Sequence, residues 1–235
     1  MLYARNILFI KMCVMNISVF DVIGPIMIGP SSSHTAGAAR LARAARIIAG
    51  EKPLKVSFGL HGSFAKTCKG HGTDRALVAG ILGIKEDDER LKGSFDIAKS
   101  QNIEYEFYKI EIADAHENTV KITFFYGDGS TCEVIGSSVG GGKISITNIN
   151  GFESKIDFQN PTMVIFQKDE KGIISEISSV LLSNNLNIAQ MYLIRKTKGE
   201  TACCVIETDD DIPTETVEQL LKFKGILNAE ILEKI

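Results

Sequence analysis

Apolar and polar positions divide the chain into short helices and strands whose order suggests two domains. An alanine-rich stretch, residues 36–49, follows the polar run 31–35 and ends at Gly50, which predicts a capped helix. A second helix is expected from Thr73 or Asp74 to Leu82, and residues 87–101 are expected to be helical in part. Strands are expected at residues 54–60, 103–112, 119–126, 131–135 and 143–147, with a hairpin turn at 128–129.

The pattern relaxes around residues 148–161, where two turn signals occur, and then becomes regular again. Strands at 162–166, 187–195, 201–207 and 226–232 alternate with helices at 172–183 and 213–222. This βαββαβ order, over about 75 residues, is that of a ferredoxin-like domain. The expected fold class is therefore α+β: an N-terminal mixed-sheet α/β domain and a C-terminal βαββαβ domain. The expected boundaries are an extension at 1–14, a first domain at 15–150, a linker at 151–160 and a second domain at 161–235.

Net charge and hydropathy argue against a nucleic-acid-binding protein and against a membrane-spanning protein, but they do not indicate a particular function. The formal net charge of −3 over 235 residues lacks the basic excess of a nucleic-acid-binding protein. No apolar run reaches the ~18 residues of a membrane-spanning helix, and no cleavage site follows the short apolar run near the N-terminus. We therefore expect a cytoplasmic protein that binds neither nucleic acid nor membrane. The absence of Trp and the aromatic content of 7% predict largely aliphatic cores.

The five cysteines form no recognisable disulfide or metal-ligand pattern. Their number is odd, and no pair has the C-x-x-C spacing. Cys203 and Cys204 are adjacent in a predicted strand, so their side chains should face opposite sides of the sheet. By itself, then, the chain predicts no disulfide framework, zinc site or complete iron–sulfur site.

Three serines, a histidine and a threonine precede the first predicted helix. The N–H groups at a helix start suit a carboxylate or phosphate, and hydroxyl groups add further donors. The alternative is a serine cap before an alanine helix, for which one serine suffices. The candidate ligand-binding residues are Ser31, Ser32, Ser33, His34 and Thr35.

A second group surrounds His71, which stands between two glycines just before the second helix. An imidazole with its usual pKa of about 6.5 suits a general base near neutrality, and the glycines allow close approach of a ligand. The alternative is a glycine-rich turn with a surface histidine. Four neighbouring residues complete this candidate group: Ser63, Thr67, Lys69 and Thr73.

Two further loops carry weaker signals. His116 and Asn118 lie between two predicted strands, where an ordinary turn histidine is the competing interpretation. The loop 167–172 joins the first strand and helix of the second domain, and its glycine leaves helix N–H groups free for a small anion. The competing interpretation there is a solvated loop.

Four stretches together resemble the beta subunit of the iron–sulfur-dependent bacterial L-serine dehydratases: residues 18–25, 29–37, 62–74 and 138–142. The resemblance runs from about residue 15 to the C-terminus. The last part, from residue 161, resembles an ACT domain, an amino-acid-sensing module. It has that family's Asp-x-x-Gly loop at 169–172 and its Asn-Ile pair at 187–188.

The resemblance implies a lyase of amino-acid catabolism and gluconeogenesis that converts L-serine to pyruvate and ammonia. It implies a [4Fe–4S] cluster ligated by a separate alpha subunit, no pyridoxal phosphate, and no metal ligand on this chain. A cluster iron would polarise the substrate hydroxyl. His71 is the favoured base, with Thr73 orienting its ring and Lys69 keeping it neutral. His34 is the competing base. The expected substrate-binding residues are Ser31, Ser32, Ser33, Thr35, Ser63, Thr67, Lys69, His116 and Asn118.

For the ACT domain the resemblance implies self-association and a small amino-acid effector at the shared edge, with Gln167, Asp169, Gly172 and Asn187 lining the site. Some residues depart from the family pattern. Cys68 stands where the family usually has glycine, and Glu117 where it usually has proline. Gln167 stands where some relatives have histidine, and His61 where an aromatic residue is common. Cys68 could alter the loop or supply a reactive thiol. The alternative function is a non-catalytic regulatory protein that binds amino acids with both domains.

Overall fold

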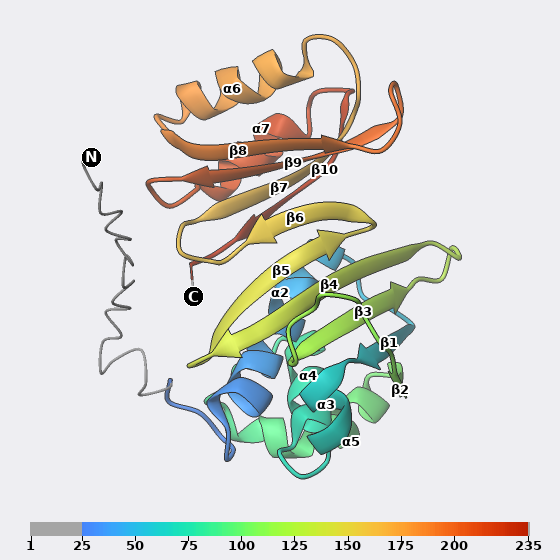
Figure 1. Ribbon diagram of the computed structural model, residues 1–235. Coiled ribbons are helices and arrows are strands. Elements are labelled where there is room, and N and C mark those ends of the chain that lie inside the picture. The colour runs from blue at the N-terminus through green and yellow to red at the C-terminus, as the bar shows by residue number, and fades with distance from the viewer. Residues whose placement is uncertain (1–24, 235) are drawn as a thin grey trace, which may run out of the picture.

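Two sheets, each covered by helices, make up the part of the chain that the computed structural model describes, residues 25–234 (Figure 1). The expected extension at 1–14 and most of the motif at 18–25 lie outside these residues. Within them, no helix combines the length and the apolar character needed to cross a membrane.

The first domain has a six-stranded sheet in the order β2-β1-β3-β4-β5-β6. Strands β1 and β2 are parallel and the other neighbours are antiparallel, which confirms the expected mixed sheet. Its strands are β1 (Lys55–Leu60), β2 (Glu104–Lys109), β3 (Thr119–Phe125), β4 (Thr131–Gly140), β5 (Lys143–Ile149) and β6 (Phe152–Ile156). Its helices are η1 (Ser32–Gly37), α2 (Ala38–Ala49), α3 (Gly62–Thr67), α4 (Thr73–Ile81), η2 (Glu89–Gly93) and α5 (Ser94–Ser100).

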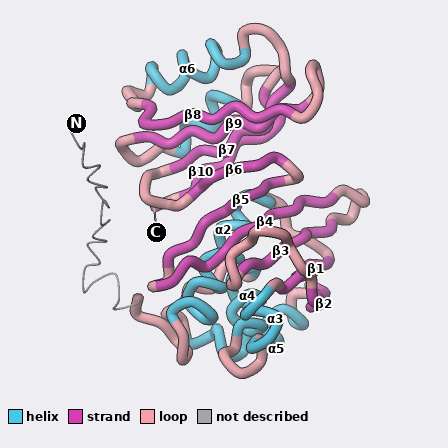
Figure 2. Tube along the Cα trace, in the orientation of Figure 1, coloured by secondary structure: helices cyan, strands magenta, loops and turns pink. Residues whose placement is uncertain are grey.

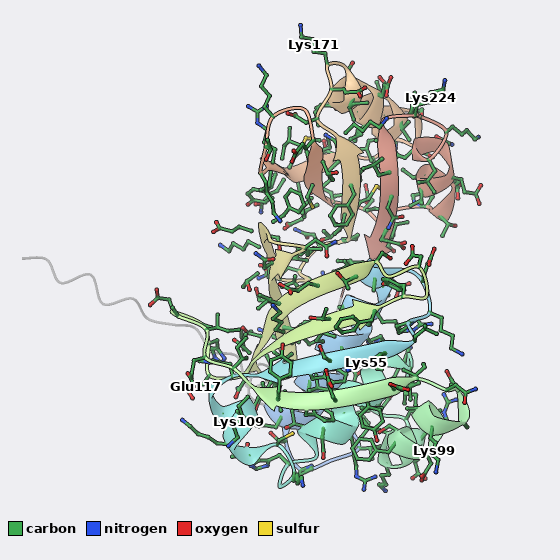
Figure 3. The ribbon with its side chains drawn as sticks, turned by 90° about the vertical axis from the view of Figure 1, so that its right-hand side faces the viewer. Lys55, Lys99, Lys109, Glu117, Lys171 and Lys224 are labelled. Carbon is green, nitrogen blue, oxygen red and sulfur yellow. The ribbon has the colours of Figure 1, made fainter. Side chains whose placement is uncertain are left out.

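The helices cover one face of this sheet, and the face that carries Lys55 is turned to the viewer in Figure 3. Small side chains allow α2 and α4 to pack closely, because a Cβ at Gly80 would collide with Ala39 and Ala42. Phe58, Phe64 and Phe124 are fully buried, and most of the other buried residues of this core are aliphatic, as the absence of Trp predicts.

Two expectations about the first domain are wrong. Residues 152–156, expected to lie in a linker, form β6, because Asn150 and Gly151 adopt positive φ (52° and 77°) and turn the chain back along β5. Phe152 and Ile156 then face the core, and Glu153 and Lys155 are exposed. Helix α3 was not expected either, because its six residues are too few to show helical periodicity. The domain boundaries themselves stay a prediction.

The second domain has the order β10-β7-β9-β8, all antiparallel, with two helices on one face (Figure 2). This is the ferredoxin-like βαββαβ fold expected from the sequence. Its elements are β7 (Thr162–Lys168), α6 (Ile173–Ser183), β8 (Ile188–Arg195), β9 (Thr201–Thr208), α7 (Thr214–Leu220) and β10 (Ile226–Leu232).

The two domains share a core, which the adjacent cysteines of β9 illustrate. Cys204 packs with the residues beneath α6 and α7, whereas Cys203 belongs to the core cluster of the first domain. Val164, Val205 and Leu232 lie on the same side as Cys203. The expected opposite orientation of the two cysteines is confirmed, and the second face of the C-terminal sheet packs against the first domain.

Candidate functional site

The serine-rich run forms the start of the first helix. Ser31 is the N-cap, with an extended backbone, and its Oγ accepts a hydrogen bond from His34 N at 3.1 Å. The first turn is a π-helix, Ser32–Gly37, so the helix begins four residues earlier than expected. A π-turn is uncommon and frequently occurs at functional sites. One serine caps the helix, which leaves the other hydroxyls for other contacts.

His34 connects this turn to α3. Its Nδ1 lies 3.0 Å from Ser33 Oγ, and its Nε2 lies 3.0 Å from Ser63 Oγ. The edge of its ring packs against Phe64, with 5.3 Å between ring centres. In a neutral imidazole one ring nitrogen donates and the other accepts, so the two serines together hold the ring in one orientation.

His71 lies beside His34, with 4.9 Å between the ring centres. Burial, and then the neighbouring His71, lower the pKa of His34, so His34 is neutral at neutral pH. Thr35 Oγ1 donates to the backbone oxygen of His71 at 2.9 Å and so fixes the loop that carries it. The structure thus brings together His34, Ser33, Ser63, Thr35 and His71, from three separate stretches of sequence.

Not every expected contact is present. Thr73 is fully buried, and its hydroxyl has no hydrogen-bond partner within residues 25–234, so it does not orient the His71 ring. Thr35 fixes this loop instead, through the backbone. Thr67 Oγ1 donates to Ser63 O at 2.9 Å, within α3. Lys69 is exposed in the loop between α3 and α4. Their roles in substrate binding stay predictions.

The turn 116–118 is fastened to the same cluster through its backbone. Glu117 O accepts hydrogen bonds from Ser63 N at 2.6 Å and Phe64 N at 3.4 Å, at the start of α3. His116 is exposed, and its Nδ1 accepts from Asn118 N at 3.1 Å, as in an ordinary turn histidine. Glu117 lies at the left-hand rim of the lower domain in Figure 3. Sequence reasoning missed Glu117 as a contact, because a backbone carbonyl leaves no residue-type signal.

Asn118 connects this turn to β4. Ser138 N donates to Asn118 O at 3.0 Å, and Asn118 Nδ2 donates to Ser138 O at 3.4 Å. Ser138 is fully buried directly against Gly37, where any Cβ would collide with its hydroxyl group. Ser138 therefore fixes the first helical turn against the sheet, a role the sequence did not indicate.

Cys68 and His61 lie close in sequence to the cluster but differ in chemistry. Burial and the nearby Asp74 raise the pKa of the Cys68 thiol to about 11, so it stays protonated and is not a reactive thiolate. His61 is buried, and its Nδ1 accepts from Ile112 N at 3.2 Å. Its contacts are those of a structural histidine.

A buried ion cluster holds the chain that enters the serine turn. Glu86 Oε1 lies 2.6 Å from Arg40 Nε, and Oε2 lies 2.9 Å from Arg43 Nη1, both on α2. Ile28 N donates to Glu86 O at 2.7 Å, just before the serines. Arg40 Nη1 also donates to Gly142 O at 3.0 Å. Glu86 and Arg40 thus position the serine turn without belonging to it.

The Glu86 cluster predicts a pH effect. Burial alone would raise the pKa of Glu86. Hydrogen bonds from its own backbone N–H and from Arg40, together with the positive charges of Arg40 and Arg43, outweigh burial and lower this pKa below its ordinary value. A lowered pKa stabilises the fold above the unfolded value, about 4.5, and this stabilisation is lost as pH falls through the folded value. Glu86→Gln should cost about 1–3 kcal/mol at pH 7 and much less at an acidic pH below the folded pKa of Glu86, measured by urea unfolding. The exposed Glu89→Gln is the control; an equal loss at both pH values would contradict the assignment.

The three serines predict separable mutant effects. Ser31→Ala removes the cap and should lower stability by about 0.5–2 kcal/mol. Ser33→Ala removes the Nδ1 partner of His34 and should reduce kcat/KM of the assembled enzyme with little change in melting temperature. Ser32 makes neither of these contacts, so Ser32→Ala should leave the melting temperature unchanged, and a rise in KM would report its expected contact with the substrate. Equal loss of melting temperature in all three variants, with kcat/KM unchanged, would leave only the capping interpretation.

The described residues do not form a metal site of their own. Within residues 25–234, no three His, Cys, Asp or Glu side chains lie together as a metal-ion site. Burial raises the pKa of Cys132 to about 11 and of Cys203 and Cys204 to about 12, which disfavours the thiolate form that ligates iron. The hydroxyl and imidazole groups of the cluster fit contacts to a substrate and do not fit a [4Fe–4S] ligand set.

The expected effector residues of the second domain do not converge within one chain. Asp169 follows β7 at the end of the sheet where Lys168 pairs with Thr201, whereas Asn187 precedes β8 at the opposite end, where Ile188 pairs with Thr208. Gly172 has φ 97° at the start of α6, and Gln167 is buried with 2% of its surface exposed. Asn187 pairs with Asp209 through its side chain. A site containing both Asp169 and Asn187 therefore needs two copies of the domain.

Fold and site together define a two-domain chain in which a mixed-sheet domain with a serine–histidine cluster precedes a ferredoxin-like βαββαβ domain. A family model described as "Serine dehydratase beta chain" matches residues 18–104. The chain is 42% identical over 212 residues to the "Probable L-serine dehydratase, beta chain" of Bacillus subtilis (strain 168), covering 90% of this chain and 96% of that protein. It is 41% identical over 217 residues to the "L-serine dehydratase, beta chain" of Peptoniphilus asaccharolyticus, covering 92% and 98%.

The chain therefore belongs to the family of L-serine dehydratase beta chains, and it is a lyase subunit. Among solved structures, the ACT domain from GTP pyrophosphokinase of Chlorobium tepidum is similar to the C-terminal part. It is 21% identical and covers 31% of this chain and 95% of that chain, with a TM-score of 0.26. The ferredoxin-like assignment rests on the strand order rather than on this comparison.

Proposed function

We propose that this chain supplies the substrate-facing loops of a cytoplasmic L-serine dehydratase whose [4Fe–4S] cluster is ligated by a separate alpha subunit. The reaction would convert L-serine to pyruvate and ammonia without pyridoxal phosphate. In this proposal residues 15–150 carry the substrate side of the site, and residues 161–235 carry regulation. The observation that carries it is the series of side-chain contacts Ser33–His34–Ser63, which lies beside His71 in a protein that belongs to this family.

The residues divide the chemistry among themselves. The N–H groups and hydroxyls of the first helical turn bind the carboxylate of serine. His71 removes the proton from the α-carbon, and as the bond between the β-carbon and the hydroxyl oxygen breaks, the hydroxyl leaves with one proton as water. The remaining enamine tautomerises to the imine, which water hydrolyses to pyruvate and ammonia. Burial and the neighbouring His71 lower the pKa of His34, so the His34 ring, held in place by Ser33 and Ser63, adds no positive charge beside His71 when His71 takes up the proton. The bound cluster would act as a Lewis acid at the substrate hydroxyl.

The first test uses this chain alone. Because the described residues present no ligand set for a cluster, the full-length chain purified without oxygen should be colourless, hold no iron and release no pyruvate from L-serine. Iron retained by this chain together with pyruvate release would contradict the proposal of a composite site.

We also propose that two copies pair along β8, the edge strand of the C-terminal sheet. Tyr192 and Leu193 on this edge expose 40% and 46% of their surfaces. If the two β8 strands pair antiparallel, the start of one lies beside the end of the other, which brings Asn187 of one copy toward Asp169 of the next. A small amino-acid effector would bind in that shared site.

Point substitutions test this edge better than truncation. Deleting the second domain would uncover Phe152 and the core that both domains share. Leu193→Lys places two like charges near the pairing edge and should halve the mass in solution, measured by light scattering. Leu182→Lys is the control, because Leu182 lies on α6 and is 78% exposed. An unchanged mass in Leu193→Lys would contradict β8 pairing.

A further inference from the structure

A lysine of the C-terminal domain holds a turn of the first domain. Lys196 Nζ, in the β8–β9 hairpin, donates to Asn150 O at 2.6 Å and lies 4.8 Å from the centre of the Phe152 ring. Any Cβ at Gly151 would collide with this ammonium group. The hairpin and the β5–β6 turn lie on the same, right-hand side of Figure 1. The contact is close, polar and confined to a few atoms.

Asp169, in the loop between β7 and α6, forms hydrogen bonds with the same hairpin. Asp169 Oδ2 accepts hydrogen bonds from Arg195 Nη1 and Gly199 N, both at 2.9 Å. Asp169 N also donates to Glu200 O at 2.7 Å. Because Lys196 stands between Arg195 and Gly199 in the hairpin, its position depends on these bonds. The loop that carries Asp169 and the hairpin form one hydrogen-bonded unit.

On the other side, the turn under Lys196 is bonded to β4. Glu133 N donates to Asn150 Oδ1, and Asn150 N donates to Glu133 O, both at 2.7 Å. Strand β4 continues from Glu133 to Ser138, which packs against Gly37 in the first helical turn of the candidate site. A continuous series of contacts therefore links the loop of Asp169 to the serine turn.

We propose that Asp169, Arg195 and Lys196 form a latch through which the C-terminal domain acts on the candidate site. When Asp169 leaves Arg195 and Gly199, the hairpin releases Asn150, and the β5–β6 turn and β4 lose a support. That an effector displaces Asp169 rests on the proposed function of the C-terminal domain. The mechanical link between Asp169 and β4 does not, and it can be measured without any effector.

Amide hydrogen exchange of the full-length chain, followed by mass spectrometry, tests the latch. Asp169→Ala removes the carboxylate that accepts hydrogen bonds from Arg195 and Gly199 of the hairpin. Arg195→Met removes one of these hydrogen bonds from the other side. Lys196→Met removes the ammonium group that binds Asn150 O and keeps most of the aliphatic part of the side chain. Controls are Asp209→Ala, at the opposite end of the same sheet, and Lys222→Met, an exposed lysine after α7. The readout is exchange in peptides covering residues 131–152, where none of these substitutions lies.

The latch predicts that Asp169→Ala and Lys196→Met each speed exchange in residues 131–152 by about threefold to tenfold, and that the double variant exchanges no faster than either one. Both controls should exchange like the original chain. If Lys196→Met alone speeds exchange and both Asp169→Ala and Arg195→Met leave residues 131–152 unchanged, Lys196 is a fixed docking contact and the latch is wrong. Additive effects in the double variant, or no effect of Lys196→Met, would also overturn it.

Discussion

Replacing His71 by alanine should lower kcat of the assembled enzyme for L-serine by about 10²–10⁴-fold, with a much smaller change in KM. His71 lies at the cluster with its ring against His34, whereas both nitrogens of the His34 ring are within hydrogen-bond distance of serine hydroxyls. A base that moves a proton needs a ring nitrogen free to reach it. Loss of that group should slow proton removal and leave carboxylate binding at the helix start intact.

Deuterium incorporation at the α-carbon of serine from heavy water separates proton removal from binding, so it should fall with kcat in His71→Ala. His116→Ala is the comparison variant, because exposed His116 is an expected substrate contact and not a base. Its loss should change KM and leave deuterium incorporation at saturating serine close to that of the original chain. Survival of exchange and kcat in His71→Ala, with loss of both in His34→Ala, would assign the base to His34 instead.

Gly62→Ala should damage both stability and activity. Gly62 has φ 54°, and a Cβ there would lie 2.6 Å from Glu117 O and 2.9 Å from Glu117 Cα. Because these are backbone atoms, relief requires the turn 116–118 or α3 to move. We expect a loss of about 1–3 kcal/mol in the free energy of unfolding. Activity should fall further than the folded fraction does, since the movement displaces Ser63 from His34.

Gly70→Ala is the control for this substitution, because it lies in the next loop with ordinary backbone angles. Its Cβ would have Thr67 O as its nearest neighbour, at 3.6 Å, an ordinary contact. Stability should stay within about 0.5 kcal/mol of the original chain. Equal melting temperatures for Gly62→Ala and Gly70→Ala would show that the turn 116–118 does not fix Ser63.

The sequence predicted elements well where the periodicity is long and failed where the structure depends on a turn. The helix expected at 36–49 and the βαββαβ order of the second domain are strongly periodic. Both are confirmed, with the first helix ending at Ala49 as expected and beginning earlier, at Ser32. Strand β6 was missed because Asn150-Gly151 predicts a turn but does not indicate that a strand comes after the turn. Helix α3 was missed because six residues span fewer than two turns.

The candidate site shows a similar division. Glycine and histidine spacing indicated which loops carry chemistry, and the structure brings Ser33, His34, Ser63 and His71 together. The sequence did not predict which residues of the site form hydrogen bonds with one another, because hydrogen bonds between loops depend on how distant segments pack. Ser138 acts through burial and Glu117 through its backbone carbonyl, and neither contact can be inferred from the residue type, although Ser138 begins the stretch 138–142.

An active site completed by an alpha subunit is the central feature of the proposed enzyme. The direct measurement is anaerobic co-expression with a candidate cysteine-rich alpha chain, purification of the complex through a tag on this chain, and a pyruvate assay with L-serine. A composite site predicts that the copurified, iron-loaded complex forms pyruvate and that neither chain does so alone. A complex that copurifies with its iron but forms no pyruvate would contradict the composite site and favour a non-catalytic amino-acid-sensing protein.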